Sequence, residues 1–519
     1  MRKEAVLLAP LLLAAYSVLS LYGHNINEVL PREALPLLGA ALLAALAVVA
    51  PLRLWLKDPA RAGVIATLLL ATAFFYGPLF QGADQLLGGR LGHKVFLPAI
   101  GAAALGLSWW LARGAKAEIF AHFFLVTTLI LLLTPLSQIW EHQRHDREVE
   151  LPDPTRLFPV TAAAKQIAAH HPHVYYLVLD RYAGPGTLSH AYRYDNGAFY
   201  HWLAERGFLL APRAFANYTK TAHSLASTLN MTYLDDLARQ LGGGSADFTP
   251  LHRMIQDNRV WRQFEALGYE YIHIGSRWTA TRYNPNAREN YNRLPPSGFR
   301  ELYLDRTALL AVKHRRAGRH TWWERLCRQH HYQFETLGEL AERSTAFFAF
   351  AHILLPHPPF VFDAAGRCVD PHTRRNRPKQ QNYLDQLRYT NRLLMDLIER
   401  IQARDPRAVI ILQADEGPYP DRYDRNEEGF DWRQATDEEL QQKFGILLAL
   451  RAPGMSPRHL PPDSSPVNLF RILFEFFYDL DVATLPDRAF TFIDGRHLYD
   501  FIEITDRLKR PLDTAIDRH

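Results

Sequence analysis

Three acidic residues stand where the sequence predicts two buried strands to end. The run 173–179 (HVYYLVL) is followed by Asp180, and the run 408–414 (AVIILQA) is followed by Asp415 and Glu416. Both runs are apolar and rich in β-branched or aromatic residues, which is typical of strands buried on both faces of a parallel sheet. Ligands of open α/β sheets bind at the carboxyl ends of the strands. The two runs therefore predict a metal site at one edge of a sheet.

A hydroxyl group at the start of a helix is the second chemical feature. Residues 222–231 (AHSLASTLNM) predict a helix, and Thr221 directly precedes them. Thr221 fits two interpretations. One is an ordinary helix cap, worth about 1 kcal/mol; the other is a nucleophile placed where the helix dipole favours a developing or transferred anion. Taken alone, the local sequence favours the cap.

Strands and helices alternate along the chain after residue 172, and these elements must position the chemical groups. Apolar runs at 269–274, 346–354 and 444–450 predict further strands, while residues 381–403 and 467–478 predict helices. This alternation predicts an α/β domain with a mostly parallel sheet.

Two stretches depart from this alternation. Residues 278–340 mix Arg, Tyr and Trp without a clear period, and we interpret them as an insertion. Residues 417–442 are polar and acidic, which predicts a loop or lid.

The composition excludes some classes of function. A formal net charge of +5 is small for 519 residues, so no nucleic-acid partner is expected. The two cysteines, Cys327 and Cys368, lack the spacing of a zinc site. Their separation in the sequence leaves open a disulfide or two unpaired thiols.

The chain before residue 141 is apolar. Five segments are each near the ~20 residues that a spanning helix needs, and they lie at about 5–22, 34–52, 62–80, 95–112 and 119–140. They hold almost no ionisable residues at mid-depth, which argues against a transporter. With the N-terminus inside, the cytoplasmic connections carry more Arg and Lys than the others, and an odd number of spans leaves the rest of the chain outside. The sequence predicts a membrane anchor at 1–140, a linker at 141–172 and an extracytoplasmic domain at 173–519.

Five short motifs resemble a known family when they are taken together. LVLDRYAG, NYTKTAHSLASTLNM, AHILLPHPPF, ILQADEGP and KFGILLAL occur in this order. They resemble the sulfatase-like branch of the alkaline phosphatase superfamily. With five spans in front, the chain is similar to membrane-anchored lipoteichoic acid synthases and lipid A phosphoethanolamine transferases. The likeness covers residues 173–500, and for residues 1–140 it rests on topology alone.

The resemblance implies roles for individual residues. Asp180 matches a metal ligand of the family, and Asp415 with Glu416 matches a ligand pair that is usually Asp-His. Thr221 matches the nucleophile, which is also a metal ligand. Ser224 matches the serine that follows the nucleophile by three residues, and we expect it among the substrate-binding residues.

Substrate contacts and the metal follow from the same resemblance. His352 or His357 matches a substrate-contacting histidine, and Lys443 lies where a basic residue could meet a phosphate. Glu416 replaces the histidine of the family pair. Because oxygen-only ligands suit harder ions, we expect one divalent ion, with Mn, Mg or Ca favoured over Zn. The same replacement leaves open a catalytically silent member of the family.

The resemblance implies a transferase of the bacterial inner membrane whose C-terminal domain faces the periplasm or the cell exterior. It would move a phosphoglycerol or phosphoethanolamine head group from a membrane lipid to an envelope glycan or lipid through a phospho-threonine. One alternative is a hydrolase of phosphoric or sulfuric esters, although the Cys or Ser that sulfatases use is absent at Thr221. The other is a silent scaffold or binding protein of the cell envelope.

Overall fold

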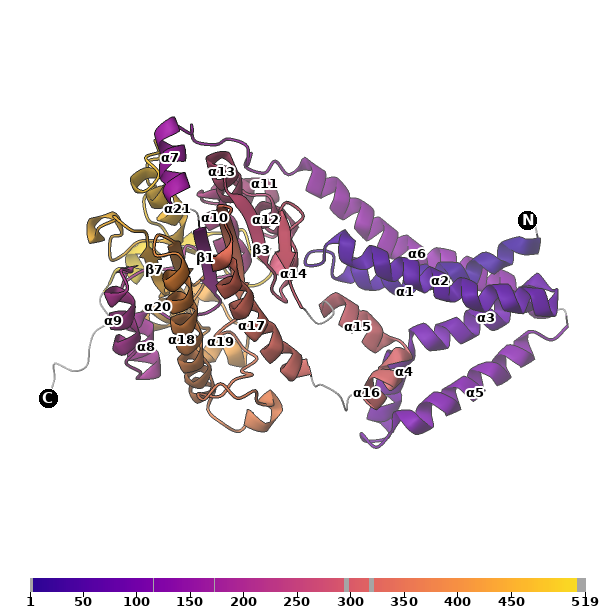
Figure 1. Ribbon diagram of the computed structural model, residues 1–519. Coiled ribbons are helices and arrows are strands. Elements are labelled where there is room, and N and C mark those ends of the chain that lie inside the picture. Colours follow the sequence, from indigo (N-terminus) through magenta and orange to yellow (C-terminus); the bar gives the residue numbers. More distant parts are fainter. Residues whose placement is uncertain (1–2, 115, 172, 294–297, 317–321, 511–519) are drawn as a thin grey trace. The chain divides into compact units, whose positions relative to one another are not determined.

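The chain forms two compact units (Figure 1). The computed structural model describes residues 3–114, 116–171, 173–293, 298–316 and 322–510. Unit 1 comprises Met1–Glu148 and Pro296–Thr321, and unit 2 comprises Val149–Pro295 and Trp322–His519. The first boundary lies beyond the predicted end of the anchor at residue 140 because helix α6 continues to Glu148. The predicted insertion 278–340 is shared between the two units.

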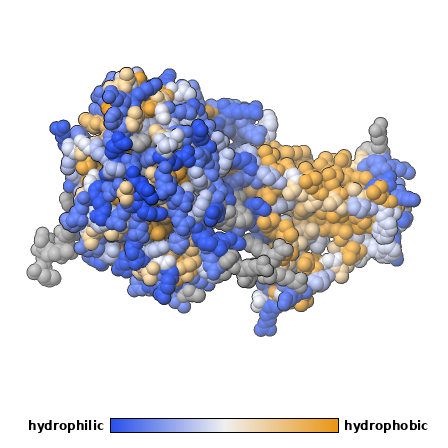
Figure 2. All heavy atoms as spheres, in the orientation of Figure 1, coloured by the Kyte–Doolittle hydropathy of each residue, from blue (hydrophilic) through white to orange (hydrophobic). Residues whose placement is uncertain are grey.

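Unit 1 is helical, and most of its helices are apolar. They are α1 (Leu8–His24, after a 3₁₀ turn at Lys3–Leu7), α2 (Pro31–Leu56), α3 (Pro59–Phe74), α4 (Tyr76–Leu86), α5 (His93–Leu111), α6 (Lys116–Glu148), α15 (Gly298–Arg306) and α16 (Leu309–Arg316). Within the described residues, four helices are long and apolar enough to cross a membrane, namely α1 with its 3₁₀ turn, α2, α5 and α6. Helices α3 and α4 reach this standard only together and are bent by 64° at their junction, inside the predicted third segment. Figure 2 shows the apolar surface of these helices.

Unit 2 is organised around a seven-stranded sheet with the order β2-β7-β6-β1-β5-β3-β4. Its strands are β1 (His173–Leu179), β2 (Leu209–Leu210), β3 (Glu270–Ile274), β4 (Glu289–Tyr291), β5 (Phe347–Ile353), β6 (Val409–Gln413) and β7 (Leu448–Arg451). Strands β6, β1, β5, β3 and β4 are parallel, whereas β7 is antiparallel to both β6 and β2. The predicted strand 444–450 begins later, at Leu448, because Phe444 is the last residue of helix α20.

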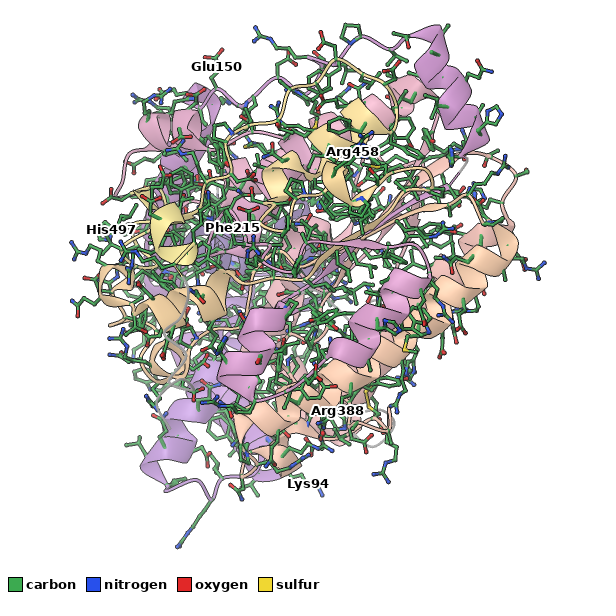
Figure 3. The ribbon with its side chains drawn as sticks, turned by 90° about the vertical axis from the view of Figure 1, so that its left-hand side faces the viewer. Lys94, Glu150, Phe215, Arg388, Arg458 and His497 are labelled. Carbon is green, nitrogen blue, oxygen red and sulfur yellow. A yellow bond between two sulfur atoms is a disulfide. The ribbon has the colours of Figure 1, made fainter. Side chains whose placement is uncertain are left out.

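Helices surround this sheet (Figure 3). They are α7 (Ala162–His170), α8 (Pro185–Tyr192), α9 (Gly197–Glu205), α10 (Thr221–Asn230), α11 (Asp235–Leu241), α12 (Thr249–Gln256), α13 (Arg259–Leu267), α14 (Thr279–Arg282), α17 (Trp322–Glu339), α18 (Lys379–Arg404), α19 (Asp421–Arg425), α20 (Asp437–Phe444), α21 (Pro466–Phe476) and α22 (Thr505–Leu508). A short pair, β8 (Phe490–Thr491) and β9 (Ile502–Glu503), completes the unit. Cys327 and Cys368, which the sequence left open, form a disulfide with their Cα atoms 6.0 Å apart.

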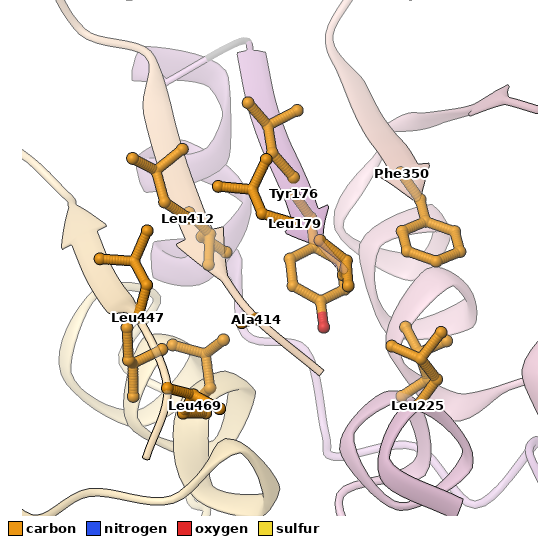
Figure 4. Packing of buried hydrophobic residues seen from close by; sticks show 14 of the residues in the cluster. Tyr176, Leu179, Leu225, Phe350, Leu412, Ala414, Leu447 and Leu469 are labelled. Atoms are coloured by element: carbon orange, nitrogen blue, oxygen red, sulfur yellow. The ribbon is translucent and has the colours of Figure 1, made fainter. Parts of the chain in front are cut away.

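The centre of the sheet is fully buried. All seven residues of β1 are buried, as are those of its neighbours β5 and β6. Figure 4 shows Tyr176 among apolar side chains that include Phe350 and Leu412. The Tyr176 hydroxyl donates to Gln413 Oε1 at 3.0 Å, which satisfies the one polar atom that its side chain buries. A rigid centre of this kind fixes the positions of the residues that follow each strand.

The stretch 417–442, which its polarity predicts to be a loop or lid, is partly helical and partly buried. It contains α19 and the start of α20, and it buries Tyr419, Tyr423 and Trp432. The rings of Tyr419 and Tyr423 stack with centroids 4.2 Å apart. Aromatic residues spaced among the charges pack this segment, and this spacing outweighs its average polarity.

Candidate active site

Asp180, His352 and Asp415 meet where three neighbouring strands end. Asp180 follows β1, Asp415 lies two residues after β6, and His352 is the penultimate residue of β5. One potential ligand atom from each residue lies within 4.8 Å of the other two, and all three side chains are buried. The parallel register of β1 with both neighbours brings these ends together. The sequence predicted this edge as the site of the acidic residues.

The polar atoms of this cluster fit a cation. Asp180 Oδ1, Asp415 Oδ2 and His352 Nε2 are buried and have no hydrogen-bond partner among the described residues. Buried polar atoms without partners are costly, and a metal ion is one of the few groups that would satisfy two carboxylates and an imidazole at once. Thr281 Oγ1 lies 2.9 Å from His352 Nδ1, so Nε2 is left to face Asp180 Oδ2 at 3.6 Å. A bond of this kind orients a metal-binding imidazole.

The electrostatics of the two carboxyl groups differ. Burial raises the pKa of Asp415 well above its usual value, and the nearby Asp180 and Glu416 raise it further. Burial also acts against the charge on Asp180, but His357 and His352 outweigh it and lower its pKa. Two carboxylates this close cannot both ionise without a neighbouring positive charge. This balance again fits a cation between them.

Thr221 is the first residue of α10, not its cap. The N-cap position is taken by Lys220, and no side chain caps the helix. The interpretation of Thr221 as an ordinary cap is therefore wrong. Its side chain is half-buried, whereas Thr219 is fully buried, and its hydroxyl acts to lower the pKa of the Asp415 carboxyl group against the effect of burial. Thr221 is thus the threonine that a substrate could reach.

Ser224 lies one turn further along α10 and is fully buried. Its hydroxyl donates to the backbone oxygen of Asp415 at 2.6 Å. This bond ties α10 to the end of β6 and fixes the distance between Thr221 and Asp415.

Glu416 turns away from the three clustered ligands. Its Oε1 forms an ion pair with Lys443 Nζ at 2.8 Å and accepts from Arg181 Nε at 3.1 Å, and its side chain is almost fully buried. Asp415 and Glu416 lie in a bend of the backbone that follows β6. Asp415 and Glu416 are neighbours in the sequence but belong to different parts of the site.

A cluster of three cations surrounds the ring of Tyr419. Lys443 Nζ lies 3.3 Å, the Arg181 guanidinium 4.4 Å and Lys220 Nζ 5.1 Å from the ring centroid. Lys220 also donates to Tyr423 at 2.9 Å. Burial lowers the pKa of Lys443 to about 7 against the attraction of Glu416, and burial lowers the pKa of Lys220 as well.

Three residues of this cluster, Arg181, Lys220 and Tyr419, are not among those predicted from the sequence. A signal was present, because Arg181 directly follows Asp180 and Lys220 directly precedes Thr221. Arg181 has a left-handed backbone with φ of 60°, a conformation that costs free energy in a residue other than glycine. This turn directs its guanidinium toward Glu416 and Tyr419.

His357 and His352 occupy different places, although the sequence could not separate them. His357 is half-buried beside Asp180, and its ring contacts the backbone oxygen of Pro358. Burial lowers the pKa of His357 to about 3, so its imidazole is neutral at pH 7. His352 belongs to the cluster with Asp180 and Asp415.

An α/β sheet with acidic, imidazole and hydroxyl groups gathered at the carboxyl ends of its central strands is the architecture of an enzyme domain. The chain belongs to the sulfatase family, because the sulfatase family model matches residues 190–471, more than half of its length. The expected family is thereby confirmed. So is the expected fold class, with apolar N-terminal helices followed by a mostly parallel α/β domain.

Three solved structures illustrate what this chain is similar to. The C-terminal periplasmic domain of EptC from Escherichia coli, in complex with Zn, is 10% identical over 64% of this chain and 92% of its own, with a TM-score of 0.43. Lipoteichoic acid synthase LtaP from Listeria monocytogenes is 12% identical, covering 66% and 79%, with a TM-score of 0.39. The integral membrane lipooligosaccharide phosphoethanolamine transferase A from Neisseria meningitidis is 13% identical, covering 92% and 95%, with a TM-score of 0.40. No curated protein matches the chain.

Proposed function

We propose that the chain is a membrane-anchored, metal-dependent transferase that moves a phosphoglycerol or phosphoethanolamine head group from a phospholipid to an envelope glycan or lipid. The observation that carries this proposal is the position of Thr221. A half-buried hydroxyl group begins a ten-residue helix that Ser224 ties to Asp415 of the candidate metal cluster, and the cation Lys220 directly precedes it. Apolar helices in the same chain would give access to a lipid donor.

The proposed metal ligands are Asp180, His352, Asp415 and Thr221. When bound, a divalent ion supplies positive charge and lowers the pKa of a hydroxyl that coordinates it. Glu416 is left out of this set because two cations hold its Oε1. With an imidazole among the ligands, the preference for Mn, Mg or Ca that an oxygen-only site implies no longer follows, and Zn suits the set as well.

Thr221, Arg181 and Lys220 would have separate roles in the transfer. The Thr221 hydroxyl loses its proton as Oγ attacks phosphorus. The bond from phosphorus to the diacylglycerol oxygen breaks, and that oxygen takes up a proton, so that diacylglycerol leaves. Arg181 and Lys220 face the non-bridging phosphate oxygens, and the helix dipole of α10 adds to their positive field. An acceptor hydroxyl then attacks the phospho-threonine, the P–Oγ bond breaks and Thr221 is regenerated.

Covalent labelling tests the role of Thr221. With a phospholipid carrying a labelled head group, the wild-type protein should become labelled, and Thr221→Ala should lose the label completely because no nucleophile remains. Thr219→Ser is the matched control and should keep it. Labelling of Thr221→Ala at the wild-type level would refute the assignment.

The same experiment separates the alternatives. A hydrolase would release the labelled head group into water without any acceptor, and sulfatase-family membership favours this second candidate. A silent scaffold would leave the wild-type protein unlabelled in the presence of Mn or Zn.

We also propose that unit 2 lies outside the cytoplasm, on the periplasmic side of a bacterial inner membrane or at the cell exterior. The Cys327–Cys368 disulfide supports this location, because disulfides persist in oxidising compartments. A reporter enzyme fused after residue 519 should be active only outside the cytoplasm. Activity inside would refute this location and, with it, the proposed substrates.

A further inference from the structure

Helices α15 and α16 interrupt the sequence of unit 2 but pack within unit 1. Phe299 and Tyr303, four residues apart on one face of α15, are both buried in a cluster with residues of α1, α2 and α3. The ring of Phe299 meets that of Tyr22 edge to face at 6.3 Å. The Tyr303 hydroxyl lies 3.0 Å from the hydroxyl of Ser17, which is also buried. These contacts dock α15 against helices that are apolar enough to span a membrane.

The docking point coincides with the junction of α3 and α4. The backbone N–H of Ala308 donates to the carbonyl oxygen of Ala73 at 2.7 Å, in the last turn of α3. Carbonyl groups at the end of a helix lack partners within the helix, and in lipid they must be satisfied by protein. A Cβ atom on Gly77 would lie 2.1 Å from the carbonyl oxygen of Asp305, so glycine is required for this close approach.

Among the side chains that the structure describes, α15 and α16 expose three large apolar residues, beside the exposed Arg300. Leu302, Leu309 and Val312 are 46%, 55% and 40% exposed. Helix α15 packs against α2 and α4, and α16 packs against α5. These neighbours also expose large apolar residues, among them Leu86 and Val95. The exposed apolar surface of the spans therefore continues onto α15 and α16.

We propose that α15 and α16 are a membrane-embedded clamp, which closes the bend between α3 and α4 and contacts phospholipid through Leu302, Leu309 and Val312. Segment 298–316 carries more basic than acidic residues, which suits the boundary between acyl chains and phosphate head groups. The clamp goes beyond the proposed catalytic function. It ties the chain of unit 2 to the bilayer at a second place, independent of the stretch between α6 and α7.

Proteolysis of the full-length protein in membranes tests the clamp. A protease site introduced at residues 153–156 separates α1–α6 from the remaining chain. After cleavage and washing, at least three quarters of the C-terminal fragment should stay in the membrane pellet. Gly77→Ala should release most of it, because the added methyl group collides with the backbone of Asp305. Gly82→Ala is the matched control on the same helix, since its Cβ meets nothing within 4 Å. Release of the wild-type fragment, or equal retention in Gly77→Ala, would overturn the clamp.

A second measurement tests the lipid contact without relying on a variant that alters packing. Both natural cysteines are in the disulfide, so Leu309→Cys introduces a single free thiol. A fluorophore on this thiol, in vesicles of brominated phospholipid, should be quenched at least twofold more than one on Phe476→Cys, an exposed apolar position of unit 2. Equal quenching at the two positions would show that α16 does not meet lipid.

Discussion

The candidate active site has an acidic half, formed around Asp180, His352 and Asp415, and a basic half, formed around Arg181, Lys220 and Lys443. The adjacent residues Asp415 and Glu416 belong to different halves. Asp415 faces Asp180 and His352, whereas Glu416 faces Arg181 and Lys443. The two side chains have similar chemistry and similar burial but opposite partners. Each has one buried oxygen without a hydrogen-bond partner, but the other oxygen of Asp415 accepts from the Arg181 backbone N–H at 3.3 Å, whereas the other oxygen of Glu416 pairs with two cationic side chains. The role of a carboxylate in this site therefore depends on whether the backbone directs its side chain toward the acidic half or the basic half.

Glu416 has a different role from the one that its alignment with a metal-binding histidine suggests. As a substitute for a metal-binding histidine, it would add negative charge to a site for an anionic substrate. As the partner of Arg181 and Lys443, it holds two cations in a buried place where neither is stable alone. His352 supplies an imidazole to the acidic half from β5. On this basis Glu416 is no reason to regard the site as silent.

The largest effect is expected in the acidic half. Asp415→Asn removes one of the two clustered carboxylates, so the affinity for Mn or Zn should fall more than about 100-fold, beyond the loss usual for residues that only orient a ligand. Transfer activity should fall with it. Calorimetric titration of the purified full-length protein in detergent measures the affinity. An unchanged affinity for Mn or Zn in Asp415→Asn would show that Asp415 does not bind the metal and would contradict the division into an acidic and a basic half.

A substitution in the basic half should lower the free energy of unfolding and leave the metal affinity nearly unchanged. Glu416→Gln leaves the Lys443 ammonium and the Arg181 guanidinium without their buried counter-charge, which costs about 3–5 kcal/mol when one partner of a buried pair is removed. Denaturant unfolding measures the loss, and the double variant Glu416→Gln with Lys443→Met should recover part of it. Metal affinity should stay within threefold of wild type. A loss of metal affinity as large as that of Asp415→Asn would make Glu416 a ligand after all.

Much of the fold and the acidic half was predictable from the sequence, because both depend on local patterns. The runs ending at Asp180 and Asp415 are apolar over a whole strand, and a parallel sheet must bring such ends to one edge. The basic half depends on contacts distant in sequence, such as that of Lys443 with Tyr419, which no periodicity records. His352 was assigned to the substrate because the sequence does not reveal that β5 lies beside β1.

Segment 298–316 shows the same limit in unit 1. Its mixture of Arg, Tyr and Leu has no clear period, and nothing in it indicates that Phe299 and Tyr303 pack on α1 instead of on the sheet. The bend at the α3–α4 junction was equally hidden, because the residues of a bent helix pair are as apolar as those of a straight span. In both places the structure depends on a partner that lies elsewhere in the chain.

The smallest expected effect is on stability, and it follows from replacing Tyr419, whose ring contacts all three cations of the basic half. Tyr419→Leu keeps an apolar side chain but removes the face toward Lys443, Arg181 and Lys220, so stability should fall by about 2 kcal/mol, the usual value for a desolvated cation–π contact. Tyr419→Phe keeps the ring and should lose much less. Denaturant unfolding of both variants measures the difference. If they are equally destabilised, the hydroxyl of Tyr419 organises the basic half and its ring does not.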